Sequence, residues 1–339
     1  MTTLLVTGGA GFIGSNFIRH WLTNHPRDSV INLDRLTYAG NLANLDDVVK
    51  NHGKNYKFVK GDIGNFDLVF YLLKTYQPDV IVNFAAETHN SRSVLHPKVF
   101  YETNVLGTQT LLEAARQAGI GRFHHISTCE VYGDLPLDVD ESFSETSPFR
   151  PRTPYNASKA AADLAVRAYH ETYQLPVTVS NCSNNYGPYQ FPEKVIPHFT
   201  IQGLRGQQLT LYKSSHHQRE WLHVDDHCRA IELILEHGEI GEVYNVGSGV
   251  EADVEMIADF VLSVLELDES YKTYVEDRPG HDRRYLLDST KLRTTLGWEP
   301  MVPFEHGLRE TIRWYVDHPE WWKPLLDKIE IKEESWKNE

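Results

Sequence analysis

A glycine-rich turn near the amino terminus constrains the fold of this chain more than any other segment. The apolar run Leu4-Leu5-Val6 leads into Thr7-Gly8-Gly9-Ala10-Gly11-Phe12-Ile13-Gly14, and a helical pattern follows through Leu22. Such glycines allow a tight turn, a close backbone approach to a pyrophosphate and close helix–sheet packing. The first N–H groups of the helix would then face the phosphates. The turn therefore predicts a dinucleotide site that includes Gly8, Gly11, Phe12, Ile13 and Gly14.

The residue after the second predicted strand selects the kind of dinucleotide. Residues 29–33 form that strand, and Asp34 follows the last glycine of the turn by about 20 residues, where the fingerprint has its acid. A carboxylate there accepts hydrogen bonds from a ribose diol and repels a 2′-phosphate. We therefore expect NAD rather than NADP, although the neighbouring Arg35 weakens that preference.

Two further strand ends should border the same site. The third predicted strand, Tyr56–Lys60, leads to Asp62 and Ile63, which suit the edge and face of an adenine ring. Residues 79–84 resemble a buried parallel strand that ends at Ala85 and Ala86. Ligands of open α/β sheets bind at the carboxyl edge of the strands, so we expect these residues around the cofactor.

Strand-like and helix-like segments alternate along the chain, with helical runs at 64–77, 98–118 and 157–173. This order predicts an α/β fold, a doubly wound parallel sheet of the Rossmann type. We expect an NAD-binding domain over 1–180 and a smaller substrate region over 181–325. The two should be interleaved, because strands near 177–180 and 243–246 should return to the main sheet.

A tyrosine and a lysine at helical spacing indicate the chemistry. Tyr155 and Lys159 stand four residues apart, so on a helix they share one face. An ammonium beside a phenol lowers the pKa of the phenol. The pair predicts a base that takes a proton from a substrate hydroxyl as hydride leaves the same carbon. Both residues should also contact the cofactor.

Composition limits the class of protein. No apolar run reaches the roughly 20 residues of a membrane span, and the first residues already form the first strand, so we expect no signal peptide and no membrane partner. The three cysteines lack metal-ligand spacing, which predicts a reduced, cytoplasmic protein without a metal site. A formal net charge of −14 argues against nucleic acid as a partner.

Longer motifs carry a resemblance to a known family. The glycine turn, the run from Asp34 through Leu36 and Thr37 to Asn41, the Ser127–Gly133 segment and the Tyr155/Lys159 pair are similar to those of extended short-chain dehydrogenase/reductases. Within that superfamily the chain resembles the dTDP-glucose 4,6-dehydratases. Residues 184–194, 219–227 and 277–285 are similar to segments of that family, and the likeness extends to about residue 325.

The resemblance implies a reaction on a nucleotide-linked hexose. Tyr155, helped by Thr128 and Lys159, would deprotonate the C4 hydroxyl while NAD takes hydride. Glu130 matches the family's base for the C5 proton. The family's acid for the C6 hydroxyl is an Asp directly before that Glu, and here the position holds Cys129. A thiol is mostly protonated at neutral pH, so Cys129 can still act as an acid at this place. It can instead handle a proton at C5 together with Glu130, each on one side of that carbon, or merely fill space as a small buried residue.

Other departures from the family surround the sugar site. The family's Glu-Ser-His-Val-Asp-Arg-Ser run appears as residues 87–93 with Asn90 for Val and Ser91 for Asp, and an Arg of the family is Asn181. These changes suggest a UDP-linked N-acetylhexosamine, or a sugar already dehydrated to a 5,6-ene, from which no hydroxide leaves. An ordinary dTDP-glucose 4,6-dehydratase and a non-catalytic NAD or nucleotide-sugar binder remain alternatives.

The matched motifs also imply binding residues and a partner. The substrate, UDP- or dTDP-linked, should be held by seven residues, with cations on its diphosphate. They are Thr88, Asn184, Glu193, Lys194, Arg219, Arg278 and His281. Segments 98–118 and 157–173 correspond to helices that pair across a two-fold axis in related enzymes, so we expect a homodimer by analogy.

Overall fold

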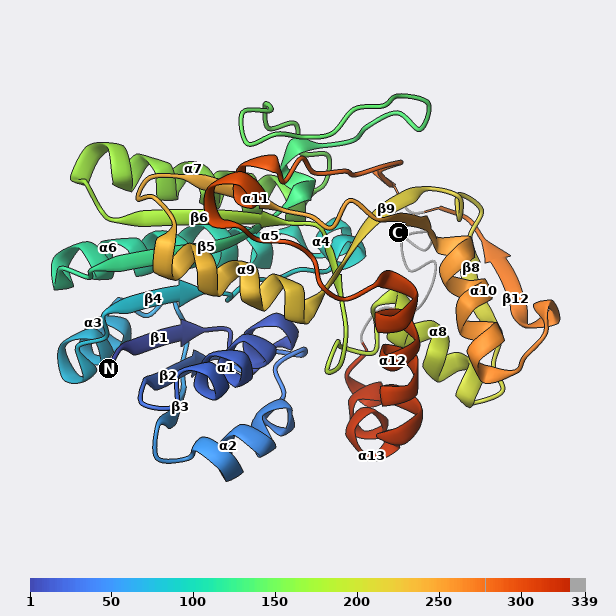
Figure 1. Ribbon diagram of the computed structural model, residues 1–339, viewed down its shortest axis with the longest axis horizontal. Coiled ribbons are helices and arrows are strands. Elements are labelled where there is room, and N and C mark those ends of the chain that lie inside the picture. Colours follow the sequence, from blue (N-terminus) through green and yellow to red (C-terminus); the bar gives the residue numbers. More distant parts are fainter. Residues whose placement is uncertain (278, 330–339) are drawn as a thin grey trace.

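A seven-stranded parallel sheet forms the centre of the protein (Figure 1). The computed structural model describes residues 1–277 and 279–329. The strand order is β10-β6-β5-β4-β1-β2-β3, so the sequence order reverses between β1 and β4. Such a switch point opens a crevice at the carboxyl ends of the strands, where ligands bind. The strands are β1 (Thr3–Thr7), β2 (Ser29–Asp34), β3 (Tyr56–Lys60), β4 (Val80–Asn83), β5 (Arg122–Thr128), β6 (Val177–Cys182) and β10 (Val243–Val246).

Helices cover both faces of this sheet, as the doubly wound prediction requires. On one face the apolar core contains α3 (Phe66–Tyr76), α6 (Thr108–Ala118) and α7 (Pro154–Tyr173). On the other it contains α1 (Phe12–Asn24), α2 (Asp46–His52) and α9 (Val224–His237). The central strands are buried on both faces, which explains their nearly continuous apolar sequences.

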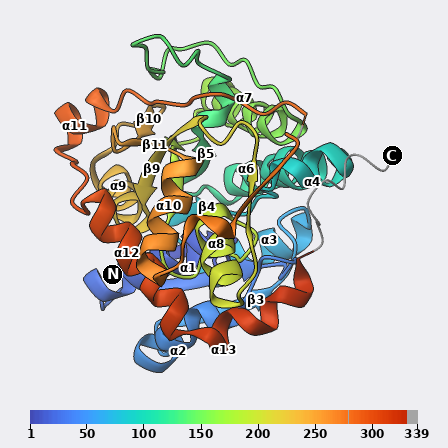
Figure 2. The same cartoon turned by 90° about the vertical axis from the view of Figure 1, so that its right-hand side faces the viewer.

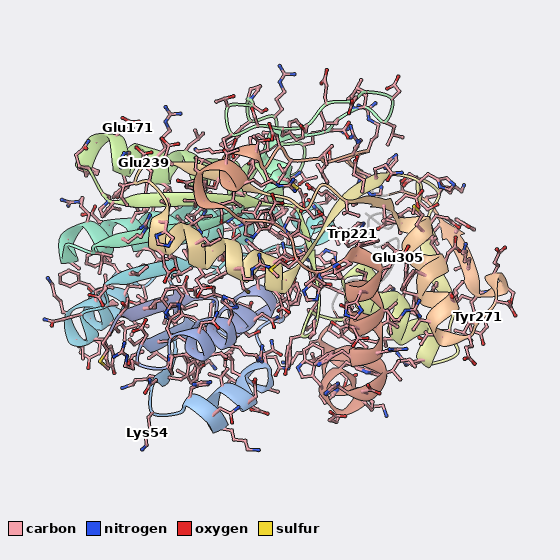
Figure 3. All side chains as sticks on the ribbon, viewed as in Figure 1. Lys54, Glu171, Trp221, Glu239, Tyr271 and Glu305 are labelled. Carbon is pink, nitrogen blue, oxygen red and sulfur yellow. The ribbon has the colours of Figure 1, made fainter. Side chains whose placement is uncertain are left out.

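A second, smaller lobe lies beside the carboxyl edge of the sheet (Figure 1), and it faces the viewer in Figure 2. Its apolar core joins the helices α8 (Val195–Leu204), α10 (Val254–Leu265) and α12 (Phe304–Asp317). Two small sheets complete it, β11-β9-β7 and β12-β8. Their strands are β7 (Asn184–Tyr186), β8 (Leu209–Tyr212), β9 (Gln218–His223), β11 (Glu251–Asp253) and β12 (Lys272–Val275). Trp221, on β9, is central in the molecule (Figure 3).

Segments from beyond residue 180 return to the main sheet. Strand β6 pairs with β5, and β10 pairs with β6, so both return to the main sheet. Helix α9 lies within the 181–325 range, yet it packs on the main sheet against α1. The remaining helices are α4 (Asn90–Leu95), α5 (Pro97–Phe100), α11 (Thr290–Leu296) and α13 (Pro319–Trp322).

The structure differs from the sequence-based prediction in the helix expected over 98–118. There α5 passes into a π-helix, Tyr101–Gly107, before the regular helix α6 begins. π-Helices are rare and often lie at functional sites. Helix α7 begins at Pro154, because the Thr153 side chain caps it by accepting a hydrogen bond from Asn156 N. Tyr155 therefore lies inside the first turn rather than before the helix.

Among residues 1–277 and 279–329, no helix combines the length and apolarity that a membrane crossing requires.

Candidate active site

A cavity of about 350 Å³ lies at the switch point of the main sheet, between its carboxyl edge and the second lobe. It is lined by the glycine turn, by the ends of β2 to β6 and by the segment that leads into α8. Most residues predicted for the site lie on its wall. They are Gly8, Gly11, Phe12, Ile13, Gly14, Asp34, Arg35, Thr37, Asp62, Ile63, Ala85, Ala86, Thr88, Thr128, Glu130, Tyr155, Lys159, Asn184, Glu193 and Lys194.

The glycine turn fits the diphosphate of a dinucleotide. Gly8 has a φ of +70°, and a Cβ atom there would lie 2.6 Å from the backbone nitrogen of Ala85. A Cβ atom on Gly14 would lie 2.5 Å from the carbonyl oxygen of Gly8. Gly11 is the N-cap of α1, and no side chain caps this helix. The N-terminal amide groups of α1 therefore border the cavity without a side-chain cap, as a phosphate site requires.

Asp34 is fixed at the end of β2 by the backbone. Its Oδ2 atom accepts a hydrogen bond from Ala10 N at 2.9 Å, and its Oδ1 atom accepts one from Leu36 N at 2.7 Å. Burial raises the pKa of this carboxyl, and the two N–H groups act in the opposite direction. Arg35 forms an ion pair with Asp62 across 3.0 Å, so its charge is compensated beside the cavity. This arrangement favours NAD, because the cation that could attract a 2′-phosphate has a partner.

Tyr155 and Lys159 both line the cavity, as predicted. The predicted lowering of the Tyr155 pKa by the Lys159 ammonium is, however, not the largest effect on that pKa. Burial raises the pKa of the Tyr155 phenol well above its usual value, Glu130 raises it further, and the Thr128 hydroxyl lowers it. The Lys159 ammonium instead donates to the carbonyl oxygen of Ile126 at 2.7 Å. Burial also lowers the pKa of Lys159.

A buried polar network behind Lys159 was not predicted from the sequence. The Lys159 Nζ atom lies 3.4 Å from His125 Nε2, which in turn lies 3.4 Å from Asp163 Oδ1. Ser127 donates to the other carboxylate oxygen of Asp163 at 2.7 Å. Burial lowers the pKa of His125 to about 4, so the ring is neutral at pH 7. Asp163 therefore supplies the compensating negative charge, and its position four residues after Lys159 on α7 is the signal that could have revealed it.

Glu130 lines the cavity, whereas Cys129 does not. A short 3₁₀ turn, Cys129–Tyr132, follows β5, and the Thr128 side chain caps it by accepting from Glu130 N at 3.3 Å. Cys129 is 0 % exposed and packs in an apolar cluster with Val131, Tyr132, Ala160, Tyr285 and Leu287. Burial, followed by Glu130, raises the pKa of the Cys129 thiol well above its usual value.

The structure therefore does not place Cys129 on the cavity wall, where a group that gives a proton to the substrate would lie. The structure favours the simpler interpretation, in which Cys129 is a small buried residue.

Polar contacts join the two lobes beside the cavity. The Tyr38 hydroxyl donates to Glu193 Oε1 at 2.8 Å, and Lys194 Nζ lies 3.8 Å from the same oxygen. Lys194 also reaches the carbonyl oxygen of Thr88 at 3.5 Å. These bonds connect the loop after β2 to the segment before α8, so residues predicted to bind substrate come from both lobes.

Besides Cys129, three of the predicted residues that the structure describes are not on the cavity wall. Leu36 lies behind Asp34, to which it donates its N–H. Arg219 is buried, and its guanidinium donates to the carbonyl oxygens of Gln218, Asp282 and Arg283. The structure thus uses Arg219 to hold the 282–283 backbone, because those carbonyls lie within its reach. His281 contacts Ser214 and Asp277 instead of the cavity. Arg278 lies outside the described residues.

The π-helix holds the loop after β4. Asn104 accepts from Glu87 N at 2.8 Å and donates to the carbonyl oxygen of Glu87 at 3.0 Å. It also donates to Ser158 Oγ on α7 at 2.8 Å. One side chain therefore links the cavity loop to the helix that carries Tyr155 and Lys159. Hydrophobic patterning gives no signal for such a residue.

Across the part of the chain that the structure describes, no three His, Cys, Asp or Glu side chains group in a way that could hold a metal ion.

Comparison with known proteins identifies the family. The family model described as GDP-mannose 4,6 dehydratase matches residues 5–311. The chain belongs to this family. A dTDP-glucose 4,6-dehydratase from Streptomyces niveus is 50% identical over 326 residues, which cover 95% of each chain. The resemblance noted in the motifs is thereby confirmed.

Solved structures of relatives agree with the fold. DesIV, a dTDP-glucose 4,6-dehydratase from Streptomyces venezuelae solved with NAD bound, has a TM-score of 0.92 and 49% identity, covering 95% of this chain and 99% of that one. A dTDP-glucose 4,6-dehydratase from Bacillus anthracis, also in complex with NAD, has a TM-score of 0.89 and 45% identity, covering 96% and 100%. The predicted Rossmann fold is confirmed, and the predicted cofactor agrees with both complexes.

Proposed function

We propose that this chain is an NAD-dependent nucleotide-sugar enzyme that oxidises C4 of a hexose transiently and completes the chemistry at C5 and C6. The product is a 4-keto-6-deoxy sugar. One observation carries the proposal: Thr128, Glu130, Tyr155 and Lys159 line the same cavity as the glycine turn. When bound, NAD would accept hydride from C4 and return it to C6 within one turnover.

The residues of the chain divide the proton transfers between them. Tyr155 takes the C4 hydroxyl proton, with Thr128 beside its phenol and the Lys159 charge one helical turn away. Because burial holds the Tyr155 phenol protonated, that positive charge is needed to form the phenolate. The C4 ketone acidifies C5, and Glu130, which lines the same wall, moves the proton at that carbon.

The substrate is proposed to differ from dTDP-glucose. Cys129 occupies the position of the family's acid and packs behind the wall, so no acid stands there for a hydroxide leaving C6. The 5,6-ene of a UDP-linked N-acetylhexosamine agrees with this departure, because no hydroxide leaves it. The UDP-linked N-acetylhexosamine itself still loses its C6 hydroxide, and it is proposed on the departures at Asn90 and Asn181. With the ene no water leaves, and the reaction is an isomerisation: one hydride moves from C4 to C6 and one proton is added at C5.

An ordinary dTDP-glucose 4,6-dehydration is the second candidate. The relatives described above favour it, since about half of their residues are identical over nearly the whole chain. In that reaction the sugar loses one water, and the C6 acid would come from a group other than Cys129. A pure binding protein is a weaker candidate, because Thr128, Glu130, Tyr155 and Lys159 all line the cavity.

The proposal extends to the state of the protein in the cell. All three cysteines are free and buried, in keeping with a cytoplasmic enzyme. We also propose a homodimer through the π-helix and α7, where Leu106 and Leu164 are 59% and 57% exposed.

A substrate panel tests the proposal. Purified protein is incubated with UDP-N-acetylglucosamine, its 5,6-ene, dTDP-glucose and UDP-glucose, and the products are analysed by mass spectrometry. Turnover of an N-acetylhexosamine or of the ene, in preference to dTDP-glucose, supports the proposed substrate. Preference for dTDP-glucose establishes the second candidate. Absence of turnover on every sugar, with NAD(H) released on denaturation, would leave only the binding role.

A further inference from the structure

Glu130 has a hydrogen-bond donor directly behind it. The side-chain nitrogen of Asn90 donates to Glu130 Oε2 at 2.7 Å. Asn90 is the first residue of α4, and it is not part of the cavity wall. Any effect of Asn90 on the reaction would therefore pass through Glu130.

The orientation of the Asn90 amide is set by a second contact. The Thr153 hydroxyl donates to Asn90 Oδ1 at 2.7 Å. The same hydroxyl oxygen accepts a hydrogen bond from Asn156 N at 3.2 Å, as the N-cap of α7. Since that oxygen accepts from the helix, its proton is directed to Asn90 Oδ1, which leaves the amide N–H groups facing Glu130.

Thr153, Asn90 and Glu130 thus form a chain of hydrogen bonds in which each group donates to the next. It begins at the N-terminus of α7, passes through Thr153 and Asn90, and ends on the Glu130 carboxylate. Donors in such a chain polarise one another, and a donor placed on a carboxylate favours its ionised form. The N-terminus of α7 adds its positive end to the same side.

We propose that Asn90, oriented by Thr153, is a positioning residue that holds Glu130 as an ionised carboxylate, ready to take the C5 proton. This inference rests on the proposed function, and it states which way the proton at C5 moves after C4 has been oxidised. The C5–H bond breaks, its proton joins a Glu130 oxygen, and the electron pair forms the enolate of the C4 ketone. Glu130 begins the cycle without a proton to give.

The inference also selects between the two proposed substrates. A hexose that keeps a hydrogen on C5 needs a base there first, whereas a 5,6-ene needs an acid. An ionised Glu130 therefore disfavours the ene, and it fits a hexose that keeps its C5 hydrogen, whether an N-acetylhexosamine or dTDP-glucose. Asn90 replaces the Val of the family's motif, so this donor is a feature of this chain.

Substitutions at Asn90 separate positioning from folding. Asn90→Leu keeps the branching at Cγ and removes the donor, and Asn90→Asp keeps an acceptor for Thr153 while placing a second carboxylate against Glu130. Asn90→Gln restores an amide. The matched control is Asn24→Leu, which removes an amide that donates to Glu232 from the end of α1 remote from the glycine turn. Melting temperatures establish that each variant is folded.

Two rates are measured on the substrate that the wild type turns over. One is reduction of bound NAD in a single turnover, and the other is exchange of the C5 hydrogen with deuterated water. We expect Asn90→Leu to slow C5 exchange by about 10²-fold and to leave NAD reduction within about 2-fold. In a plot of the C5 exchange rate against pH, the acidic limb should move to higher pH in Asn90→Leu and further in Asn90→Asp. In Asn90→Gln it should return toward its position in the wild type.

Each alternative outcome has a definite meaning. If Asn90→Leu exchanges C5 at the wild-type rate with an unshifted profile, the positioning role is wrong while the proposed function stands. Equal losses in both rates would make Asn90 a structural residue and also overturn the inference. If Asn90→Leu does not fold, the same criteria apply to Asn90→Asp. A wild type that reduces no NAD with any sugar contradicts the proposed function itself.

Discussion

The Nζ atom of Lys159 lies 2.7 Å from the carbonyl oxygen of Ile126, a bond that joins helix α7 to strand β5 inside the sheet–helix interface. Both residues border the cavity. This bond and the nearby Asp163 keep a 4% exposed cation in place. This wall of the cavity is thus held by two elements that also form the core, α7 and β5.

Tyr155→Phe should abolish the first step of the reaction. The variant removes the only atom of this side chain that can take the C4 proton, so NAD reduction should fall by about 10²–10⁴-fold. Stopped-flow absorbance of reduced NAD measures it. Tyr132→Phe is the control, because the Tyr132 hydroxyl is buried against Asn245 behind the wall. Equal rates for Tyr155→Phe and the wild type would remove Tyr155 from the mechanism.

Cys129→Ala should retain turnover. The thiol is fully buried among apolar side chains, so its loss should cost about 1 kcal/mol of stability and little activity. Denaturant unfolding and steady-state kinetics measure the two effects. Accumulation of reduced cofactor in Cys129→Ala would instead show that the thiol handles a proton after C4 oxidation.

Glu220 should make the stability of the protein depend on pH. This carboxyl is 0% exposed and accepts from Gly249 N at 2.7 Å and Leu287 N at 3.0 Å. Burial raises its pKa from 4.5 to about 7, so the folded state keeps a proton that the unfolded state has lost. Stability should therefore decrease as pH rises from about 4.5 to about 7, by about 3 kcal/mol at most.

Glu220→Gln imitates the protonated carboxyl and should flatten this dependence. Melting temperatures of both proteins between pH 5 and pH 8 give the comparison. If the melting temperature changes with pH by the same amount in Glu220→Gln as in the wild type, another group causes the pH dependence of stability.

Leu164→Glu should convert the proposed dimer to monomers. Leu164 lies on α7 and is 57% exposed, so a charge there would be buried without a partner when two copies meet. Sedimentation equilibrium at micromolar protein measures the mass. Met256→Glu, on α10 of the second lobe, is the matched control at 55% exposure. A monomeric wild type would contradict the proposed assembly.

Much of the fold was predictable because local patterns decide it. The geometry of the backbone requires glycines in the turn, and a ribose diol requires an acceptor such as Asp34. Both lie on the cavity wall as expected. Buried parallel strands have apolar sequences whatever surrounds them. Consequently the strand β4 and the helix α7 were found from sequence within a few residues.

The features of the fold and of the site that the sequence did not predict depend on contacts between segments far apart in the chain. The π-helix, Tyr101–Gly107, arises inside a pattern that fits an ordinary helix equally well. Asn90 reaches Glu130 across 40 positions of sequence, and Arg219 reaches the backbone at Asp282 across 63. Motif matching put Arg219 at the substrate and Cys129 in the cavity, but burial among their actual neighbours decides where these side chains lie.

The fate of a deuterium placed at C4 of the substrate tests the central claim most directly. The enzyme is given its preferred nucleotide sugar labelled at C4, in ordinary water, and the product is examined by NMR and mass spectrometry. The account predicts that the deuterium reappears at C6, and that a parallel reaction of unlabelled sugar in deuterated water places one deuterium at C5. Retention of the label at C4, or its loss to solvent, would contradict transient C4 oxidation.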